Sequence, residues 1–192
     1  PLLAPMSKVA GKMAFVYGLY GSQKGTGGTG KYPGAIDGKP MGTVIIIGGG
    51  NAGTAAAESF TGIGSRVLIV EKSGARRREL EELFPRAEVL PPEGLYAHLP
   101  GADVVVGAVL VPGAKAPLLI SKKQMETMKP GAVMVDISID QGGITEASRP
   151  TSIGEPCYME GHVLMCCVPN IPGTVPDTST KLLTEATLPY II

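Results

Sequence analysis

The stretch Val44-Ile-Ile-Ile-Gly-Gly-Gly-Asn-Ala-Gly53 decides the fold of this chain. Its apolar β-branched residues predict a buried strand over 44–47, and its glycines match the pattern G-x-G-x-x-G at the start of a predicted helix over 51–63. In that pattern Gly48 permits a tight turn, Gly50 lets a pyrophosphate group approach the backbone, and Gly53 lets the helix pack close to the strand. The stretch therefore predicts a dinucleotide-binding turn.

The helix after this turn begins at Asn51 and Ala52, whose backbone N–H groups have no partner within the helix. Such N–H groups, together with the positive end of the helix dipole, bind anions such as a pyrophosphate. A glycine-rich turn that binds no ligand is the alternative interpretation.

From residue 43 onward, short apolar runs alternate with helical patterns. Strands that are apolar on both faces and separated by helices indicate a parallel sheet covered on both sides. We therefore predict an α/β fold with a doubly wound parallel sheet, the Rossmann fold. The predicted strands are 44–47, 66–70, 88–90, 103–106, 133–137 and 163–167, and the predicted helices are 51–63, 76–84, 121–129 and 178–187.

The two ends of the chain differ in pattern from this alternating region. A helix is predicted over 7–20, and a glycine-rich loop or loose hairpin follows it. We divide the chain into a linking helix and loop (1–42), a Rossmann domain (43–177) and a linking helix (178–192). The apolar termini suggest a domain of a longer protein, and a complete small protein is the alternative.

An acid follows the second predicted strand, at the place where such folds bind the adenosine ribose. Glu71 lies 18 residues beyond Gly53, and a carboxylate there favours NAD because it would repel the 2′-phosphate of NADP. Lys72 and Arg76 stand nearby and belong to the same candidate cofactor site, where basic residues could accept that phosphate. The alternative is that Arg76, Arg77 and Arg78 form a solvated helix face paired with glutamates.

A second glycine-rich segment, Gly25-Thr-Gly-Gly-Thr-Gly-Lys31, resembles the start of a P-loop. Tyr32 stands where the magnesium-binding Ser or Thr should be, and no strand precedes the segment. We do not predict a nucleoside-triphosphate site.

Acidic and amide side chains follow a later predicted strand, in Val135-Asp-Ile-Ser-Ile-Asp-Gln-Gly-Gly143. Open α/β sheets bind ligands beyond the carboxyl ends of their strands. We expect Asp140 to face the chemistry and Asp136, nearer the strand interior, to have a structural hydrogen-bonding role. An Asx turn beside the two glycines is the alternative interpretation of Asp140.

Composition excludes several classes of protein. The chain has 17 Lys and Arg against 17 Asp and Glu, which argues against electrostatic binding of nucleic acid or of an anionic membrane. No run is long and apolar enough for a membrane-spanning helix. Three cysteines do not make a disulfide framework and suit a reducing compartment, so we expect a cytoplasmic protein. His98 and His162 fit no standard zinc pattern, and no metal site is predicted.

Several segments together resemble the alanine dehydrogenase / nicotinamide nucleotide transhydrogenase family, and within it the NAD-binding domain of alanine dehydrogenase. The resemblance covers nearly the whole chain. It rests on the glycine pattern and on five further blocks: Leu3-Ala-Pro-Met-Ser-Lys-Val-Ala-Gly11, Gly107-Ala-Val-Leu-Val-Pro-Gly-Ala-Lys-Ala-Pro117, 135–143, Asn170-Ile-Pro-Gly173 and Val175-Pro-Asp-Thr-Ser-Thr180.

The resemblance implies roles for residues that match the family motifs. It implies that Ser7 contacts the dinucleotide, that Leu110 belongs to the loop beside the nicotinamide, and that Asp140 and Asn170 border nicotinamide and substrate. Ile139 is predicted as a further residue of the cofactor site. Asp140 matches the catalytic aspartate of the family. The chain departs from the family pattern in having Glu71 where Asp is more usual, Pro169 where Ala is usual, and Leu90-Pro91-Pro92 near the adenine.

The implied reaction is the interconversion of L-alanine with pyruvate and ammonia, with NAD as cofactor. The other catalytic groups of the family belong to a separate domain that nothing here matches, so this chain alone should bind cofactor and do little chemistry. The family also implies a homo-oligomer. A transhydrogenase α-subunit domain and a stand-alone NAD-binding module are the alternatives.

Overall fold

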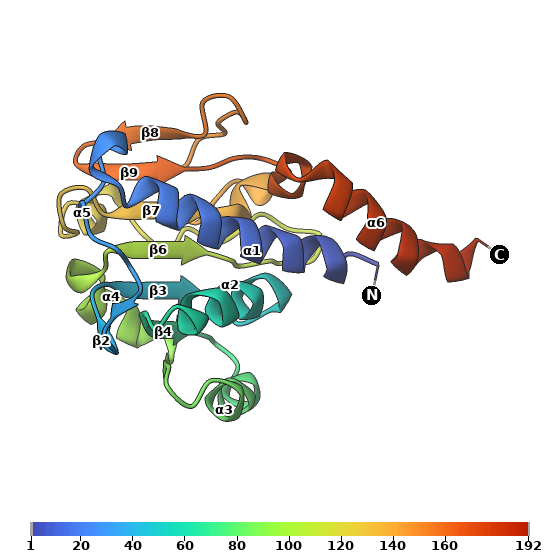
Figure 1. The fold of residues 1–192 in the computed structure, drawn as a ribbon, viewed down its shortest axis with the longest axis horizontal. Coiled ribbons are helices and arrows are strands. Elements are labelled where there is room, and N and C mark those ends of the chain that lie inside the picture. The colour runs from blue at the N-terminus through green and yellow to red at the C-terminus, as the bar shows by residue number, and fades with distance from the viewer. Residues whose placement is uncertain (1, 192) are drawn as a thin grey trace.

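The computed structural model describes residues 2–191, which form a seven-stranded sheet with helices on both faces (Figure 1). The strand order is β5-β4-β3-β6-β7-β9-β8, and every neighbouring pair is parallel except β8 with β9. This arrangement confirms the predicted Rossmann fold. The strands are β3 (Thr43–Ile47), β4 (Arg66–Val70), β5 (Glu88–Leu90), β6 (Val104–Gly107), β7 (Val133–Asp136), β8 (Cys157–Glu160) and β9 (Val163–Cys166).

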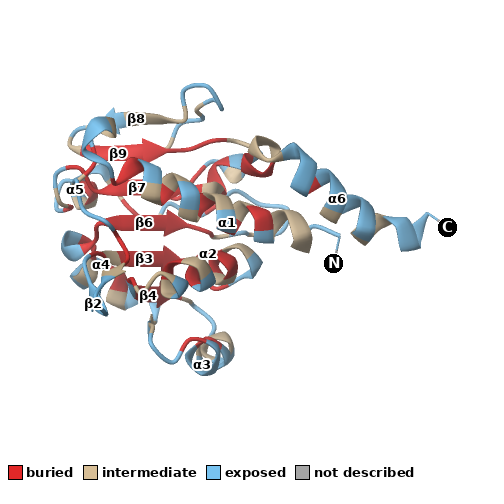
Figure 2. Cartoon of the chain, viewed as in Figure 1, coloured by how far each residue is buried: buried red, intermediate tan, exposed pale blue. Residues whose placement is uncertain are grey.

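The centre of the sheet is fully buried, as the apolar runs predicted. Ile45 of β3 pairs with Leu68 of β4 on one side and with Val105 of β6 on the other, and none of the three is accessible to solvent. Figure 2 shows the central strands as a continuous buried layer. The six predicted strands are all present, with ends displaced by one residue at most.

Three helices cover one face of the sheet: α1 (Ala4–Gly21), α2 (Asn51–Gly62) and α3 (Gly74–Leu83). The first two pack closely because Gly11 of α1 has no side chain, and a Cβ there would collide with the carbonyl oxygen of Ala52. Phe15 of α1 and Phe60 of α2 then meet edge to face, with ring centroids 5.0 Å apart. Helix α1 is therefore part of the packed core of this face.

Shorter segments cover the other face, including α4 (Leu95–His98) and α5 (Lys122–Met125). The prediction of a full helix over 121–129 was wrong, because α5 is a single turn. Ser121 and Gln124 cap its start reciprocally, but Pro130 and Gly131 follow within a few residues, and the chain turns directly into β7. Met125 and Met128 still fill the core of this face.

The edge strand β8 was not predicted. A turn at Gly161, which has φ +58°, returns the chain antiparallel to β9 and places Cys157 directly opposite Cys166. The structure joins these two cysteines in a disulfide, whereas the cysteine count alone had suggested none. Cys167 is a buried free thiol.

The last helix, α6 (Pro176–Thr187), extends away from the body of the molecule and is largely exposed (Figures 1 and 2). It confirms the helix predicted over 178–187, and it contacts α1. A short hairpin of β1 (Ala35–Ile36) and β2 (Lys39–Pro40) lies within the predicted loop. That 1–42 and 178–192 serve as links to another domain stays a prediction. Among residues 2–191, no helix is both long and apolar enough to cross a lipid bilayer.

Candidate cofactor site

A cleft of about 660 Å³ opens at the carboxyl ends of the parallel strands. It lies where the strand order reverses between β3 and β6, the position at which open α/β sheets bind ligands. The loops after β3, β4, β6 and β7 line it, as do the start of α1 and residues 170–172. The cleft thus gathers segments that are far apart in the sequence.

The glycine turn between β3 and α2 has the geometry that its sequence predicted. Gly48 has φ +104°, a conformation that L-residues with a side chain rarely adopt. A Cβ at Gly53 would collide with the carbonyl oxygen of Gly48, so the helix can begin this close to the strand only with glycine. A Cβ at Gly50 would meet no atom within 4 Å, because this residue faces the open cleft.

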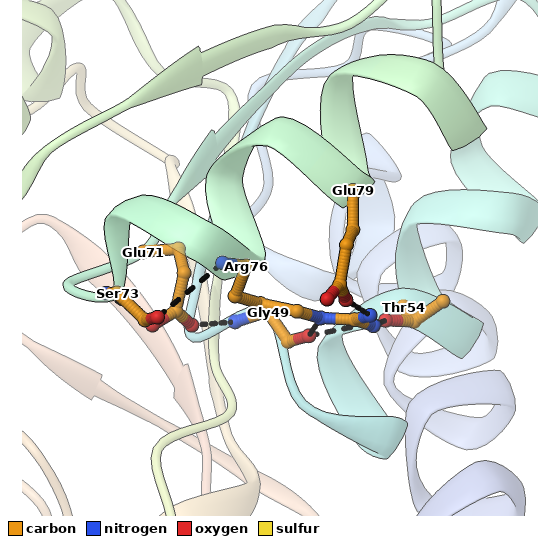
Figure 3. Close-up of polar contacts among 6 residues, drawn as sticks. All are labelled: Gly49, Thr54, Glu71, Ser73, Arg76 and Glu79. Carbon is orange, nitrogen blue, oxygen red and sulfur yellow. Dashed lines mark hydrogen bonds and ion pairs between the residues drawn. The ribbon is translucent and has the colours of Figure 1, made fainter.

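Glu71, at the end of β4, lines the cleft and holds the glycine turn with its carboxylate. Its Oε2 accepts a hydrogen bond from the Gly49 backbone N–H at 2.8 Å, and its Oε1 accepts one from the Ser73 N–H at 2.8 Å. Figure 3 shows the Glu71 side chain reaching Gly49 from one side of the turn. Lys72 is exposed and also lines the cleft.

Arg76 contacts the other side of the same turn (Figure 3). Its Nε donates to the Gly49 carbonyl at 2.9 Å, its Nη2 to Thr54 Oγ1 at 3.0 Å, and its Nη1 forms an ion pair with Glu79 at 2.6 Å. Its side chain is not among those that line the cleft. Arg76 was predicted to belong to the cofactor site, but its guanidinium bonds to protein groups outside the cleft.

Asp140 and Asn170 meet at the opposite end of the cleft. The Asn170 backbone N–H donates to the Asp140 carboxylate, at 3.0 Å from Oδ1 and 3.3 Å from Oδ2. Asn170 has φ +46°, a left-handed conformation that Asn tolerates better than most residues. Leu110, with 66% of its surface exposed, and Ser7, in the first half of α1, also line this cleft.

Asp136 lies beneath Asp140 and is buried, which confirms its predicted structural role. Its carboxylate accepts hydrogen bonds from the backbone N–H groups of Ser138 and Ile144 and from the Ser148 hydroxyl. Burial raises the pKa of Asp136 more than these three hydrogen bonds lower it. The effect of the three bonds is to hold the 137–148 segment against the end of β7.

Comparisons with known proteins agree with this geometry. The family model "Alanine dehydrogenase/PNT, C-terminal domain" matches residues 14–192. The chain belongs to this family.

The relatives that match over the whole chain are alanine dehydrogenases. Those of Mycobacterium tuberculosis and Staphylococcus epidermidis are 44% and 46% identical over 100% and 99% of the chain. A solved L-alanine dehydrogenase superimposes with a TM-score of 0.94 at 41% identity, covering 100% of this chain and 54% of that one. The chain spans about half the length of the curated relatives it matches, 53% and 52% for the two named here.

A transhydrogenase from Sinorhizobium meliloti shares the fold of this alanine dehydrogenase/PNT domain. It superimposes with a TM-score of 0.85, covering 99% of this chain and 55% of that one, but only 21% of residues are identical. At that level the likeness establishes the fold alone.

One further residue of the predicted site of this alanine dehydrogenase/PNT domain has a buried side chain. Ile139 is 5% exposed, and its side chain packs in the core together with Met134 and Ile144. Successive side chains of the 3-10 segment 137–141 point about 120° apart, so Ile139 points inward while Asp140 points into the cleft. Any contact from Ile139 to a ligand would have to come from its backbone.

Two polar residues of the domain, Ser138 and Gln141, connect the loops of the cleft; the sequence pointed to Gln141 only as an amide after the strand, and it did not single out Ser138. Ser138 Oγ accepts from the Val109 N–H at 3.0 Å, and the Gln141 side chain pairs with Val111. Their position directly after a buried strand was the available signal. His162 Nε2 lies 2.9 Å from the Met128 carbonyl, and within residues 2–191 no cluster of His, Cys, Asp and Glu could hold a metal ion.

Proposed function

We propose that this chain is the NAD-binding domain of an L-alanine dehydrogenase. The observation that carries the proposal is that one cleft contains the unobstructed Gly50, the free N–H groups of the helix start and Glu71. The relatives of this chain that are 41–46% identical are alanine dehydrogenases. The proposed reaction is the oxidation of L-alanine to pyruvate and ammonia.

The residues of the glycine turn have the chemistry to hold the pyrophosphate of NAD. In this proposal the N–H groups of Asn51 and Ala52 donate to the phosphate oxygens, and Gly50 leaves room for them. Gly48 and Gly53 act indirectly, by shaping the turn. Ser7 contacts the dinucleotide from α1, because Ser7 and the glycine turn line the same cleft.

The contacts of Glu71 and Arg76 favour NAD over NADP. The Glu71 carboxylate lies in the cleft, where it can accept hydrogen bonds from the adenosine ribose and repel a 2′-phosphate. Arg76 is engaged with Gly49, Thr54 and Glu79, which leaves Lys72 as the cation that lines the cleft.

The reacting end of the site is assigned to Asp140, with Leu110 and Asn170 beside it. NAD, when bound, supplies the nicotinamide ring that accepts the hydride. An anion at Asp140 would stabilise the positive charge that develops on the substrate nitrogen as hydride leaves the α-carbon. A cation for the substrate carboxylate and an acid/base group are also needed, and we assign both to a separate catalytic domain that closes over the cleft.

Two parts of the proposal rest on sequence and family resemblance alone. They are a homo-oligomeric assembly and a cytoplasmic location. A transhydrogenase domain is the less supported alternative, since the transhydrogenase named above is only 21% identical to this chain while the alanine dehydrogenases are 41–46% identical.

The test is an assay of the complete protein that carries this chain. We expect NADH to form when L-alanine and NAD are supplied together, and not when either is omitted. Transfer of hydride from NADH to an NADP analogue without any need for L-alanine would instead support the transhydrogenase alternative.

A further inference from the structure

The side chain of Gln141 makes a two-point contact with one residue of the neighbouring loop. Its Oε1 accepts a hydrogen bond from the Val111 backbone N–H at 3.1 Å, and its Nε2 donates to the Val111 carbonyl at 3.0 Å. A carboxamide is the one neutral side-chain group that offers a donor and an acceptor side by side. The Gln141 carboxamide therefore satisfies both backbone polar groups of Val111, as the backbone of a neighbouring strand would.

Two further contacts join the same segments. The Gln141 carbonyl accepts from the Ala116 N–H at 2.9 Å, and Ser138 Oγ accepts from the Val109 N–H at 3.0 Å. The loop 109–116 follows β6 and contains no helix or strand of its own. Gln141 therefore contacts this loop on both sides of its tip, at Val111 through its side chain and at Ala116 through its backbone carbonyl.

The position of Gln141 gives these contacts a consequence for the cleft. The residue directly before it is Asp140, and the residue directly before Val111 is Leu110; all four line the cleft. Asp140 is in turn bonded to Asn170. The Gln141 side chain thus joins the loop that carries Leu110 to the turn that carries Asp140, at the residues next to both.

We propose that Gln141 is a positioning residue, which orders the loop 109–116 at the reacting end of the cleft so that a nicotinamide ring is held between Leu110 and Asp140. This inference rests on the proposed function, because it assumes that the cleft binds NAD. It assigns no contact between Gln141 and the substrate.

The contact itself is tested without any ligand, by amide hydrogen exchange of this chain. Gln141→Met keeps the length of the side chain and removes both hydrogen bonds, while Gln141→Glu keeps an acceptor for the Val111 N–H and removes the donor. We expect exchange at the Val111 amide to quicken by roughly tenfold in Gln141→Met, about the effect of one net hydrogen bond, and by less in Gln141→Glu. Gln23→Met, at an exposed glutamine near the other end of α1, is the matched control.

The role is tested by measuring the affinities of the same variants for NADH and for ADP-ribose, which has no nicotinamide. We expect ADP-ribose to bind as it does to the unaltered chain. NADH should bind roughly tenfold more weakly to Gln141→Met, by the same estimate, so the ratio of the two affinities falls. A structural role alone would weaken both ligands or neither.

The outcomes separate the inference from the proposed function. If the unaltered chain binds neither ligand, the proposed function fails, and the exchange experiment still tests the contact. If the variants keep the ratio of the unaltered chain, whatever its value, the positioning role is wrong. Unchanged exchange at Val111 would show that the contact does not order the loop. Gln141→Glu supplies the same readouts if Gln141→Met does not fold.

Discussion

The carboxylate of Asp140 accepts the backbone N–H of Asn170, at 3.0 Å from Oδ1. This hydrogen bond joins the turn after β7 to the loop after β9, two segments 30 residues apart at one end of the cleft. The acid assigned to the chemistry is thereby held in place by a main-chain group. A substitution that keeps this bond while removing the charge can separate the two roles of Asp140.

Asp140→Asn is that substitution. The Asn side-chain oxygen can still accept from Asn170, so the geometry of the loops and the affinity for NADH should change little. Turnover of L-alanine by the complete protein should fall by at least about a hundredfold, the effect typical of losing one preorganised electrostatic contact. Turnover and NADH affinity measured on the same preparation check this prediction. Unchanged turnover would remove Asp140 from the mechanism.

Gly50→Ala should weaken cofactor binding without affecting the fold. Gly50 has φ −71°, which alanine adopts readily, and its added Cβ would meet no protein atom within 4 Å. The methyl group would instead occupy the space assigned to the pyrophosphate. We expect an unchanged melting temperature and a loss of NADH affinity of at least about tenfold, one unfavourable contact of ~1.4 kcal/mol. Gly62→Ala, also unobstructed but at the far end of α2, is the control.

Gly53→Ala, unlike Gly50→Ala, should lower the stability of the fold. Its Cβ would collide with the Gly48 carbonyl, and α2 would have to move away from β3. We expect a loss of about 1–3 kcal/mol in the free energy of unfolding, the usual cost of overpacking, and denaturant titration measures it. A Gly53→Ala chain as stable as the unaltered one would mean that this close packing is absent.

Cys167 should make the stability of the chain depend on alkaline pH. Burial, and then the nearby Asp136 carboxylate, raise the pKa of the Cys167 thiol from 9.0 to about 12. The folded state therefore keeps the proton that the unfolded state loses above pH 9. The contribution of Cys167 is complete below pH 9 and declines as pH rises toward 12, by at most about 1.4 kcal/mol per pH unit. Subtracting the pH profile of Cys167→Ala from that of the unaltered chain isolates it, and parallel profiles would contradict the prediction.

Ser65→Ala should leave the stability unchanged or raise it. Among residues 2–191, Ser65 Oγ is the buried side-chain oxygen or nitrogen that has no hydrogen-bond partner. Removing it relieves a desolvation cost, so we expect a gain of up to about 1 kcal/mol. Ser22 provides the comparison, because its buried hydroxyl donates to the Gly18 carbonyl at 2.7 Å. Ser22→Ala should lose about 1 kcal/mol, the net contribution of one hydrogen bond, and the two unfolding free energies check both predictions.

Much of the fold could be predicted because local sequence and tertiary context agree there. The run 44–47 forms the buried strand that its β-branched residues predict, and the structure bears out the steric roles of Gly48 and Gly53 in the turn that follows. The edge strand β8 could not be predicted in this way. Its burial is partial and its partner is set by a turn at Gly161, so the residues of β8 carry no strong periodic pattern.

The site was harder to predict than the fold, because side-chain direction depends on neighbours that periodicity does not reveal. Arg76 and Glu71 lie five residues apart and both contact Gly49, but only Glu71 lines the cleft. Ile139 and Asp140 are adjacent, and one enters the core while the other enters the cleft. The pairing of Gln141 with Val111 joins residues 30 apart and has no signature in the sequence.

The central claim is that this cleft binds NAD through the glycine turn and selects it through Glu71. The most direct test is a calorimetric titration of the 192-residue chain with NADH and, separately, with NADPH. We expect NADH to bind, NADPH to bind at least about tenfold more weakly, a difference of ~1.4 kcal/mol, and Gly50→Ala to weaken NADH binding by at least about the same factor. Tighter binding of NADPH, or an unchanged NADH affinity in Gly50→Ala, would contradict this claim.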